Sequence, residues 1–398
     1  MDPFDESSHR ERRDRKPRAR GVRLAATVLG ALAIAVLVGL VALWPGKVES
    51  KLSEGLTSPS ERAEVASVET APCPPPQPGT CGTARIRLES GPDEGDDATL
   101  AIGGAGLTPG LEEGDTIRVT RAAGPGGEAT YTQTDFERRT PLLVLALVFA
   151  ALVVVLGRLR GALSLVGLAI SLAVIVFFVA PAILDGESPL AVSIVGSLAV
   201  MLVTIALAHG LGPKSLAAML GTSASLLLVA LLATFAVEIT NLTGLSSEEA
   251  TLLNLNVAEI SFEGLLVAGM VIGALGVLDD VTVSQASTVL ALRRADPNQG
   301  FGKLYREALA VGRDHVSATV NTLVFAYVGS SLPVLLLFSS GAVGFVDVVN
   351  TEVVAKEVVA MLVGSIGLIA AVPLTTALTA WLSRGMTARE LGASAHAH

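Results

Sequence analysis

The chain has 398 residues, of which 51% are hydrophobic and only 16% are charged, and its mean hydropathy is +0.60. Long uncharged apolar stretches recur along it, which is typical of a helical protein that crosses a membrane several times. A net charge of −9 with 4% aromatic residues argues against nucleic acid as a partner, and five histidines and two cysteines suggest no metal cluster. We therefore expect the lipid bilayer as a partner, and no cofactor, metal or nucleic acid.

The N-terminal segment, residues 1–21, is dense in Arg and Lys, which predicts a disordered tail on the cytoplasmic side. The first apolar stretch, 22–44, is long enough to cross the hydrocarbon core and ends at Trp44 and Pro45, as at a membrane interface. No small-residue cleavage site follows it, so we interpret it as an uncleaved anchor rather than a secretory signal.

Residues 45–139 contain no apolar stretch and predict a small β-rich domain outside the cytoplasm. Several segments alternate polar and apolar residues and are separated by Gly- and Pro-containing turns. They are ARIRLES (84–90), ATLAIGG (98–104), DTIRVTR (115–121) and ATYTQTDF (129–136). Cys73 and Cys81 bracket a Pro-rich loop, and on the oxidising side of the membrane they can form a disulfide. The alternative is two free thiols in a poorly ordered linker.

A membrane domain of seven further helices is predicted over 140–383, which makes eight in total. The candidate spans are 140–157, 161–181, 189–211, 216–239, 262–283, 314–339 and 354–382. Basic residues concentrate in alternate loops, at Arg158, Arg160, Lys214 and in 284–313, while the opposite loops are acidic. This asymmetry predicts a multi-pass protein of a bacterial plasma membrane with both termini, including the tail 384–398, in the cytoplasm.

Two adjacent aspartates, Asp279 and Asp280, lie at the cytoplasmic end of the predicted sixth helix, after an uncharged run. Adjacent side chains on a helix point about 100° apart, so the pair cannot share one face. Asp280, Ser284 and Ser287 can line one face, whereas Asp279 shares its face with Thr282 and Ala286. A helix this polar is expected to pack against protein or water rather than lipid.

The predicted seventh helix starts with a second polar face. Asp314, Ser317 and Asn321 are spaced to lie together in its cytoplasmic half. The connector before it, 288–313, is basic and includes an amphipathic segment that is expected at the membrane surface. We therefore predict a substrate- or ion-binding site between helices six and seven, formed by Asp279, Asp280, Ser284, Ser287, Asp314, Ser317 and Asn321.

Three interpretations of these polar residues remain open. In a structural one, Asp279 or Asp280 pairs with a nearby arginine, of which Arg293, Arg294 and Arg313 are candidates. In the second, carboxylates, hydroxyls and an amide bind a cation or carry protons. In the third, one of the two aspartates shares a proton with Asp314, as in aspartyl hydrolases. No P-loop, HExxH or GxSxG motif is present, so no catalytic residue is assigned.

Three segments resemble one family. They are EGDTIRVT leading into DFERRTPLLVLALVFAALVVVLGRLRGALSL, then GALGVLDDVTVSQAS, and then GRDHVSATVNTLVFAYVGSSLPVLLLF. From about residue 60 to 385 the chain is similar to the YibE/F-like family of bacterial multi-pass membrane proteins. Many members have one aspartate where this chain has Asp279 and Asp280, which leaves open which of them matters. The resemblance implies the topology and emphasises helices six and seven, but implies no substrate.

The expected function is that of a permease that moves a small solute or cation through the site between helices six and seven. The alternative is a membrane scaffold or envelope-assembly factor that does not transport and binds an envelope protein through its exported β-domain. A membrane-embedded hydrolase is the third candidate, so the sequence favours a protein that is not an enzyme without deciding the question.

Overall fold

The computed structural model describes residues 3–46, 60–73, 80–102, 110–123, 129–256, 260–339, 344–384 and 386, with the backbone alone for 3–20, 80, 123 and 256. The chain forms two compact units. One comprises Met1–Val48 with Gly157–His398 and is helical, and the other, Glu49–Leu156, contains all the strands that are described below. Each unit is treated by itself.

The smaller unit is a five-stranded antiparallel sheet that curls into a half-barrel. Its strands are β1 (Ser60–Pro72), β2 (Thr80–Leu88), β3 (Asp97–Ile102), β4 (Thr116–Ala123) and β5 (Ala129–Phe136), in the order β3-β2-β1-β4-β5. The edge strands β3 and β5 also approach each other. Alternate residues point inward, such as Ala63, Val65, Ile86 and Ile117, and they form an apolar core.

Strands β2 to β5 correspond to the four alternating segments of the sequence, whereas β1 was not expected. Its sequence, SERAEVASVETAP, is rich in polar residues, yet it lies at the centre of the sheet between β2 and β4. A register shift between Val65 and Ser67 interrupts its pairing with β2. At the end of β1 the structure joins Cys73 to Cys81 by a disulfide, and the intervening residues 74–79 lie outside the described residues.

A charged cluster links the turn between β2 and β3 to strands β4 and β5. The carboxylate of Asp93 accepts hydrogen bonds from the hydroxyl of Tyr131 and, at 2.7 Å, from Nε of Arg121. The bond from Tyr131, followed by that from Arg121, holds the pKa of Asp93 below its ordinary value of 3.8. The cluster therefore stabilises the folded domain above about pH 4, and this contribution is lost as the pH falls through the lower folded-state pKa.

We expect Asp93→Asn to weaken the β-domain at neutral pH and to flatten its response to acid. In the native protein, hydrogen-exchange protection of 129–136 should fall as the pH drops below about 4, and the variant should lose most of this dependence. Asp97→Asn is the matched control, because Asp97 pairs with Arg87 in the open, where ion pairs contribute little. Equal acid responses in the native protein and Asp93→Asn would show that the cluster does not set the pH dependence.

The larger unit is built from helices. They are α1 (Pro3–Ala42), α3 (Arg139–Val174, which begins in the smaller unit), the π-helical turn η1 (Ile175–Val179), α4 (Ala180–Leu184), α5 (Pro189–His209), α6 (Pro213–Ile239), α7 (Glu248–Asn256), α8 (Phe262–Ala295), α9 (Phe301–Ser330), α10 (Leu332–Ser339), α11 (Phe345–Asn350) and α12 (Glu352–Ser383). Helix α1 thus includes most of the segment for which the sequence predicts a disordered tail.

Among the described residues, six helices are long and apolar enough to cross a membrane, or seven if the bent pair α9–α10 counts as one span. This supports a membrane protein but does not confirm eight crossings. The expected spans 140–157 and 161–181 fall within one apolar stretch, Arg139–Leu184. The backbone of Arg158, with φ 52° and ψ −133°, interrupts this stretch between the two expected spans.

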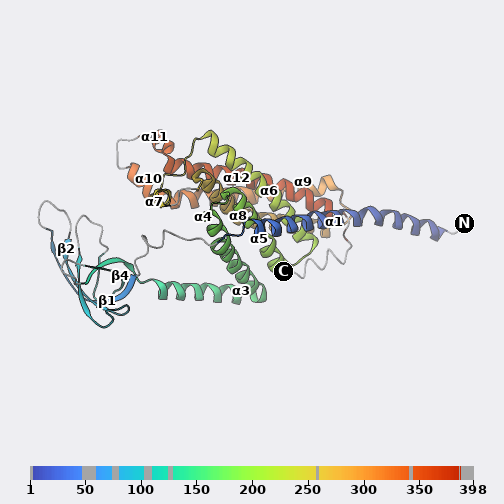
Figure 1. Ribbon diagram of the computed structural model, residues 1–398. Helices are drawn as coiled ribbons and strands as arrows, with labels where there is room; N and C mark the ends of the chain where they lie inside the picture. The colour runs from blue at the N-terminus through green and yellow to red at the C-terminus, as the bar shows by residue number, and fades with distance from the viewer. Residues whose placement is uncertain are drawn as a thin grey trace. The chain divides into compact units, whose positions relative to one another are not determined.

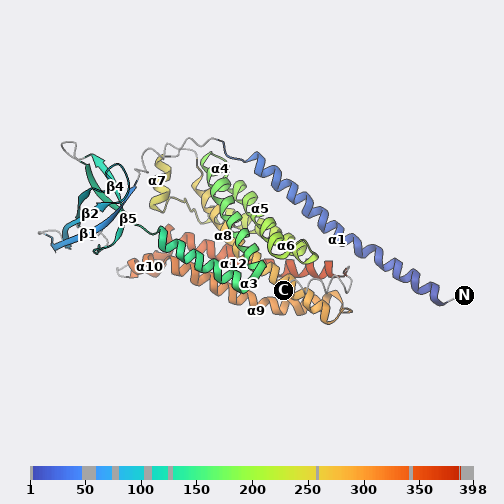
Figure 2. The same cartoon turned by 90° about the horizontal axis from the view of Figure 1, so that it is seen from below.

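The region around the expected seventh span differs from the sequence prediction. The expected surface connector, 288–313, is not a separate element, because α8 runs on to Ala295 and α9 begins at Phe301. Helix α9 then continues without a break through the expected polar face, and a bend of 62° separates it from α10. Figure 2 shows α9 and α12 lying side by side over much of their length, in agreement with their contacts.

Helix α8 is the centre of this unit. It packs against α5, α6, α9 and α12, and Figure 1 shows it among these helices. Glycines allow the closest approaches between neighbours: a Cβ on Gly221 of α6 would lie 2.2 Å from Oγ1 of Thr375 on α12, and one on Gly39 of α1 would lie 2.8 Å from Cγ2 of Val195 on α5. These contacts hold α6 against α12 and α1 against α5.

Candidate functional site

A buried polar stripe runs along α8. The helix is capped at its start by Ser261, whose Oγ accepts a hydrogen bond of 3.0 Å from the backbone N–H of Gly264. Asp279, Thr282 and Arg293 follow at spacings that keep them on one side of the helix. This side faces the other helices, because Thr282 is fully buried, Arg293 is 6% exposed and Asp279 is half-buried.

Asp279 is the most unusual member of the stripe. Its Oδ2 lies 3.4 Å from Oγ1 of Thr204 on α5, a hydroxyl that also lies 3.3 Å from the carbonyl of Met201 and has one proton to donate. Its Oδ1 is buried and has no hydrogen-bond partner among the described residues. A carboxylate is thus held between helices with one weak hydrogen bond and no cation beside it in that part of the chain.

The next turn of α8 joins α6. Oγ1 of Thr282 lies 2.6 Å from Oγ1 of Thr222, and both residues are fully buried. Thr282 also reaches back 3.1 Å to the carbonyl of Asp279. This pair of hydroxyls fixes α8 against α6 directly beside Asp279, so the backbone that carries the carboxylate is held in place.

Gln285 connects three helices. Its Nε2 donates to the carbonyl of Ala308 on α9 at 2.9 Å and to Oγ1 of Thr376 on α12 at 2.7 Å. Gly312 of α9 lies so close that a Cβ there would be 2.7 Å from Oε1 of Gln285. A polar contact therefore joins α8 to α9, and it is made by Gln285, which is not among the seven residues predicted from the sequence.

Arg293 completes the stripe near the end of α8. Its guanidinium donates to the carbonyls of Gln299 at 2.6 Å and Pro297 at 3.3 Å, and to Oγ of Ser383 at 3.3 Å. Among the described residues it forms no ion pair with Asp279 or Asp280, and neither do Arg294 and Arg313. The structural interpretation, in which an arginine neutralises one of the aspartates, thus receives no support from the described contacts.

The structure places Asp280, Ser284 and Ser287 on the opposite side of α8 from the stripe. Asp280 is exposed, and Ser284 and Ser287 are half-buried. Oγ of Ser287 donates to the carbonyl of Val283 in its own helix, at 2.8 Å. The expected shared face of these three residues is therefore one that other helices leave partly uncovered.

Asp314, Ser317 and Asn321 are all exposed on α9. Ser317 donates to the carbonyl of Arg313 in its own helix, at 3.0 Å. Among the described residues, the side chains of Asp314 and Asn321 make no hydrogen bond or ion pair, and no such contact joins Asp314 to the two aspartates of α8. A common site that unites the seven predicted residues stays a prediction, and the paired-aspartate hydrolase has no contact in its favour.

Sequence reasoning missed the residues that surround the predicted ones. Thr204 contacts Asp279, Thr222 contacts Thr282, and Thr376 contacts Gln285, which lies on α8 itself. The spacing alone showed that Asp279 and Thr282 share a face, but it left open which of Asp279 and Asp280 turns inward. The partner hydroxyls had no such signal, because isolated Ser and Thr residues occur throughout the apolar helices.

The groups around Asp279 leave the charge of its carboxylate unbalanced. Hydroxyls, amide groups and carbonyls cannot balance the charge of Asp279, so a proton or a cation must do so in a membrane interior. Oxygen atoms are the ligands that hard cations prefer. The described residues contain no group of three or more acidic, His or Cys side chains that could hold a resident metal ion.

Comparison with known proteins identifies a family to which this chain is similar. The model of the family described as YibE/F-like protein matches residues 145–385, which is more than half of the chain and includes α5 to α12. No curated protein and no solved structure matches the chain.

Proposed function

We propose, on the premise that the chain belongs to the YibE/F-like family, that this membrane protein is a permease for a small cation or a proton, with Asp279 as the residue that takes up the cargo. Neither the family description nor the apolar helices specify an activity, so the proposal rests on the polar stripe of α8. Asp314 and Asn321, which are exposed, would then form part of the route to the site rather than the site itself, and Asp280 would belong to neither.

One observation carries the proposal: Oδ1 of Asp279 is buried and lacks a partner among the described residues. A structural carboxylate between helices would be expected to have its oxygens satisfied, because an unpaired charge in an apolar interior costs several kcal/mol. A buried carboxylate without a partner is typical of a site that binds and releases a proton or a cation. The hydroxyl of Thr204, at 3.4 Å, can orient the carboxylate without neutralising it.

Ion flux into liposomes tests the proposal. The full chain would be reconstituted with an internal dye selective for protons, sodium or potassium, and a gradient of the matching cation would be imposed in separate runs with a compensating membrane potential. We expect one of these cations to move faster than in protein-free liposomes. If none of the three moves faster through correctly inserted protein, the proposed cargo class is wrong.

A second candidate function is a scaffold that binds an envelope protein. It is favoured by the β-domain, which has its own apolar core and a disulfide and lies, with the start of α3, in a compact unit of its own. Replacing residues 60–136 by a flexible linker distinguishes the two functions. If the protein is a permease, the linker variant should retain cation flux. If it is a scaffold, the linker variant should fail to complement a strain that lacks the protein, whereas Asp279→Asn should complement it.

A further inference from the structure

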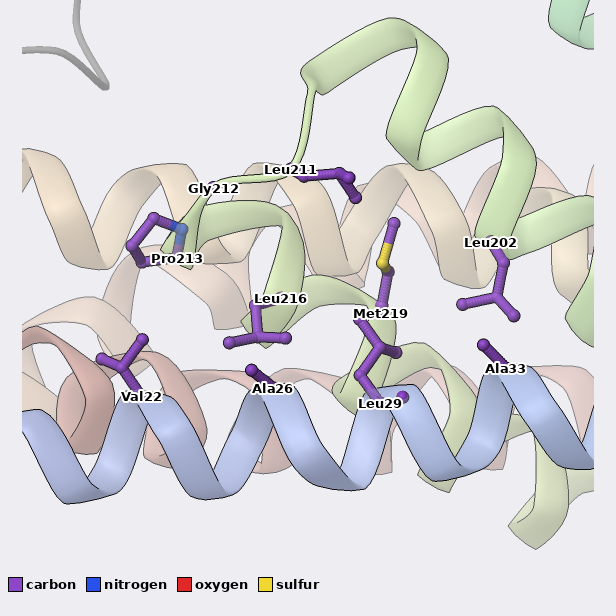
Figure 3. Close-up of a pocket in the computed structure, with 11 residues that line it drawn as sticks. Val22, Ala26, Leu29, Ala33, Leu202, Leu211, Gly212, Pro213, Leu216 and Met219 are labelled. Atoms are coloured by element: carbon purple, nitrogen blue, oxygen red, sulfur yellow. The ribbon is translucent and has the colours of Figure 1, made fainter.

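An apolar groove of about 490 Å³ lies between α1, α5 and α6, away from the polar stripe of α8. Its wall on α1 consists of Val22, Ala26, Leu29, Gly30 and Ala33, and Figure 3 shows most of these side chains directed toward the turn between α5 and α6. Every side chain that lines the groove is apolar. Its volume is within the range of pockets that bind small molecules.

The groove lies at one end of three candidate membrane spans. The apolar part of α1 begins at Gly21, α5 ends at His209 and α6 begins at Pro213, and all three boundaries are close to residues that line the groove. A groove in this position is open to the edge of a bilayer, where the acyl chains of lipids are the most abundant apolar groups.

Positive charge gathers at the same end. Arg23 follows the lining residue Val22 and is exposed, and Lys214 follows Pro213 and is half-buried. Neither forms an ion pair with another described residue. Lys214 also lies within the electrostatic influence of Arg160 and Arg294, so the region is cationic beyond these two side chains.

We propose that this groove binds an anionic phospholipid, with an acyl chain along α1 and the phosphate between Arg23 and Lys214. Basic groups beside a gap between membrane helices bind acidic head groups in this way. A second copy of the chain fits less well, because a two-fold contact would bring the same cations of both copies together. The inference does not depend on transport by Asp279.

Native mass spectrometry of the delipidated full chain in detergent tests the site. Phosphatidylglycerol and phosphatidylcholine with identical acyl chains would be titrated separately. We expect the first phosphatidylglycerol to bind about thirtyfold more tightly, as two basic groups near a head group suggest. The double variant Arg23→Gln, Lys214→Gln should remove this preference, whereas Arg306→Gln, on exposed α9 surface, should keep it.

A steric variant tests the groove separately from the charge. A Cβ on Gly30 meets nothing within 4 Å, so Gly30→Leu can extend into the groove without disturbing α1. We expect it to weaken the binding of both lipids about tenfold. Gly329→Leu is the matched control, because Gly329 also has open space but lies on α9. If Gly30→Leu unfolds the protein, Ala26→Leu narrows the same groove.

Three results would overturn the proposal. The first is equal affinity of the native protein for the two lipids. The second is unchanged lipid binding in folded Gly30→Leu or Ala26→Leu. The third is a dimer in the native protein that these variants dissociate without any change in lipid binding, because the groove would then be occupied by a second copy.

Discussion

Cation flux through Asp279→Asn is expected to fall at least about tenfold, to the level of protein-free liposomes. Asparagine keeps the size of the side chain and can accept the hydrogen bond from Thr204, but it can neither take up a proton nor balance the charge of a cation. The measurement is the initial flux in the liposome assay, with insertion and thermal stability recorded for the same preparation.

Asp280→Asn is the matched control for this prediction. It changes the same side chain one position along α8, but Asp280 is exposed and does not belong to the buried stripe. Flux through this variant should stay within about twofold of the native value, and Thr204→Val should lower flux by about two- to tenfold, as the loss of one hydrogen bond suggests. A loss of flux in Asp280→Asn together with normal flux in Asp279→Asn would reverse the roles of the two residues.

Gly221→Ala is expected to lower the free energy of unfolding by about 1–3 kcal/mol, because it overpacks the contact between α6 and α12. The new Cβ would lie 2.2 Å from Oγ1 and 3.1 Å from Cβ of Thr375, and 3.4 Å from its Cα. Thr375 is fully buried, so the two helices must separate to make room. The thermal unfolding midpoint of the full chain in detergent measures the effect, and we expect a decrease of roughly 2–10 °C.

Thr375→Ala provides a rescue. Its hydroxyl has no hydrogen-bond partner among the described residues, so its removal leaves no partner unpaired. The double variant Gly221→Ala, Thr375→Ala should recover much of the decrease in the thermal unfolding midpoint. A double-mutant cycle then gives the coupling free energy between the two positions. Gly364→Ala, on the same α12 with nothing within 4 Å of its Cβ, should not decrease the midpoint. A decrease for Gly364→Ala as large as that for Gly221→Ala would contradict the steric argument.

The sequence predicted the class of the protein and most of its elements because long apolar stretches and alternating strands are local signals. Strand β1 escaped prediction, since in SERAEVASVETAP the inward-facing residues are Glu61, Ala63 and Val65, and a charged residue among them hides the alternation of polar and apolar positions. The start of α9 at Phe301 was also missed, because the amphipathic segment before the apolar stretch resembles a surface helix. Local periodicity does not show whether two helical segments join.

The candidate site was predictable only in part. Its carboxylates were visible as charges at the end of an uncharged run, and the spacing of Asp279 and Thr282 gave the face that they share. Which face turns inward depends on the helices that pack around α8. Thr204 contacts Asp279 across 75 positions of sequence, and Gln285 contacts Thr376 across 91. One sequence without aligned relatives carries no record of such pairings.

The packing of α1 on α5 and α6 has a consequence for how the protein is made. Gly39 meets Val195, a residue synthesised about 150 positions later, so the ribosome needs roughly 10–30 s to supply the surface that covers the first helix. During that interval the β-domain is completed while α1 lacks its final neighbours. Variants that enlarge Gly39 should therefore fail when α5 packs against α1 rather than when α1 itself is made.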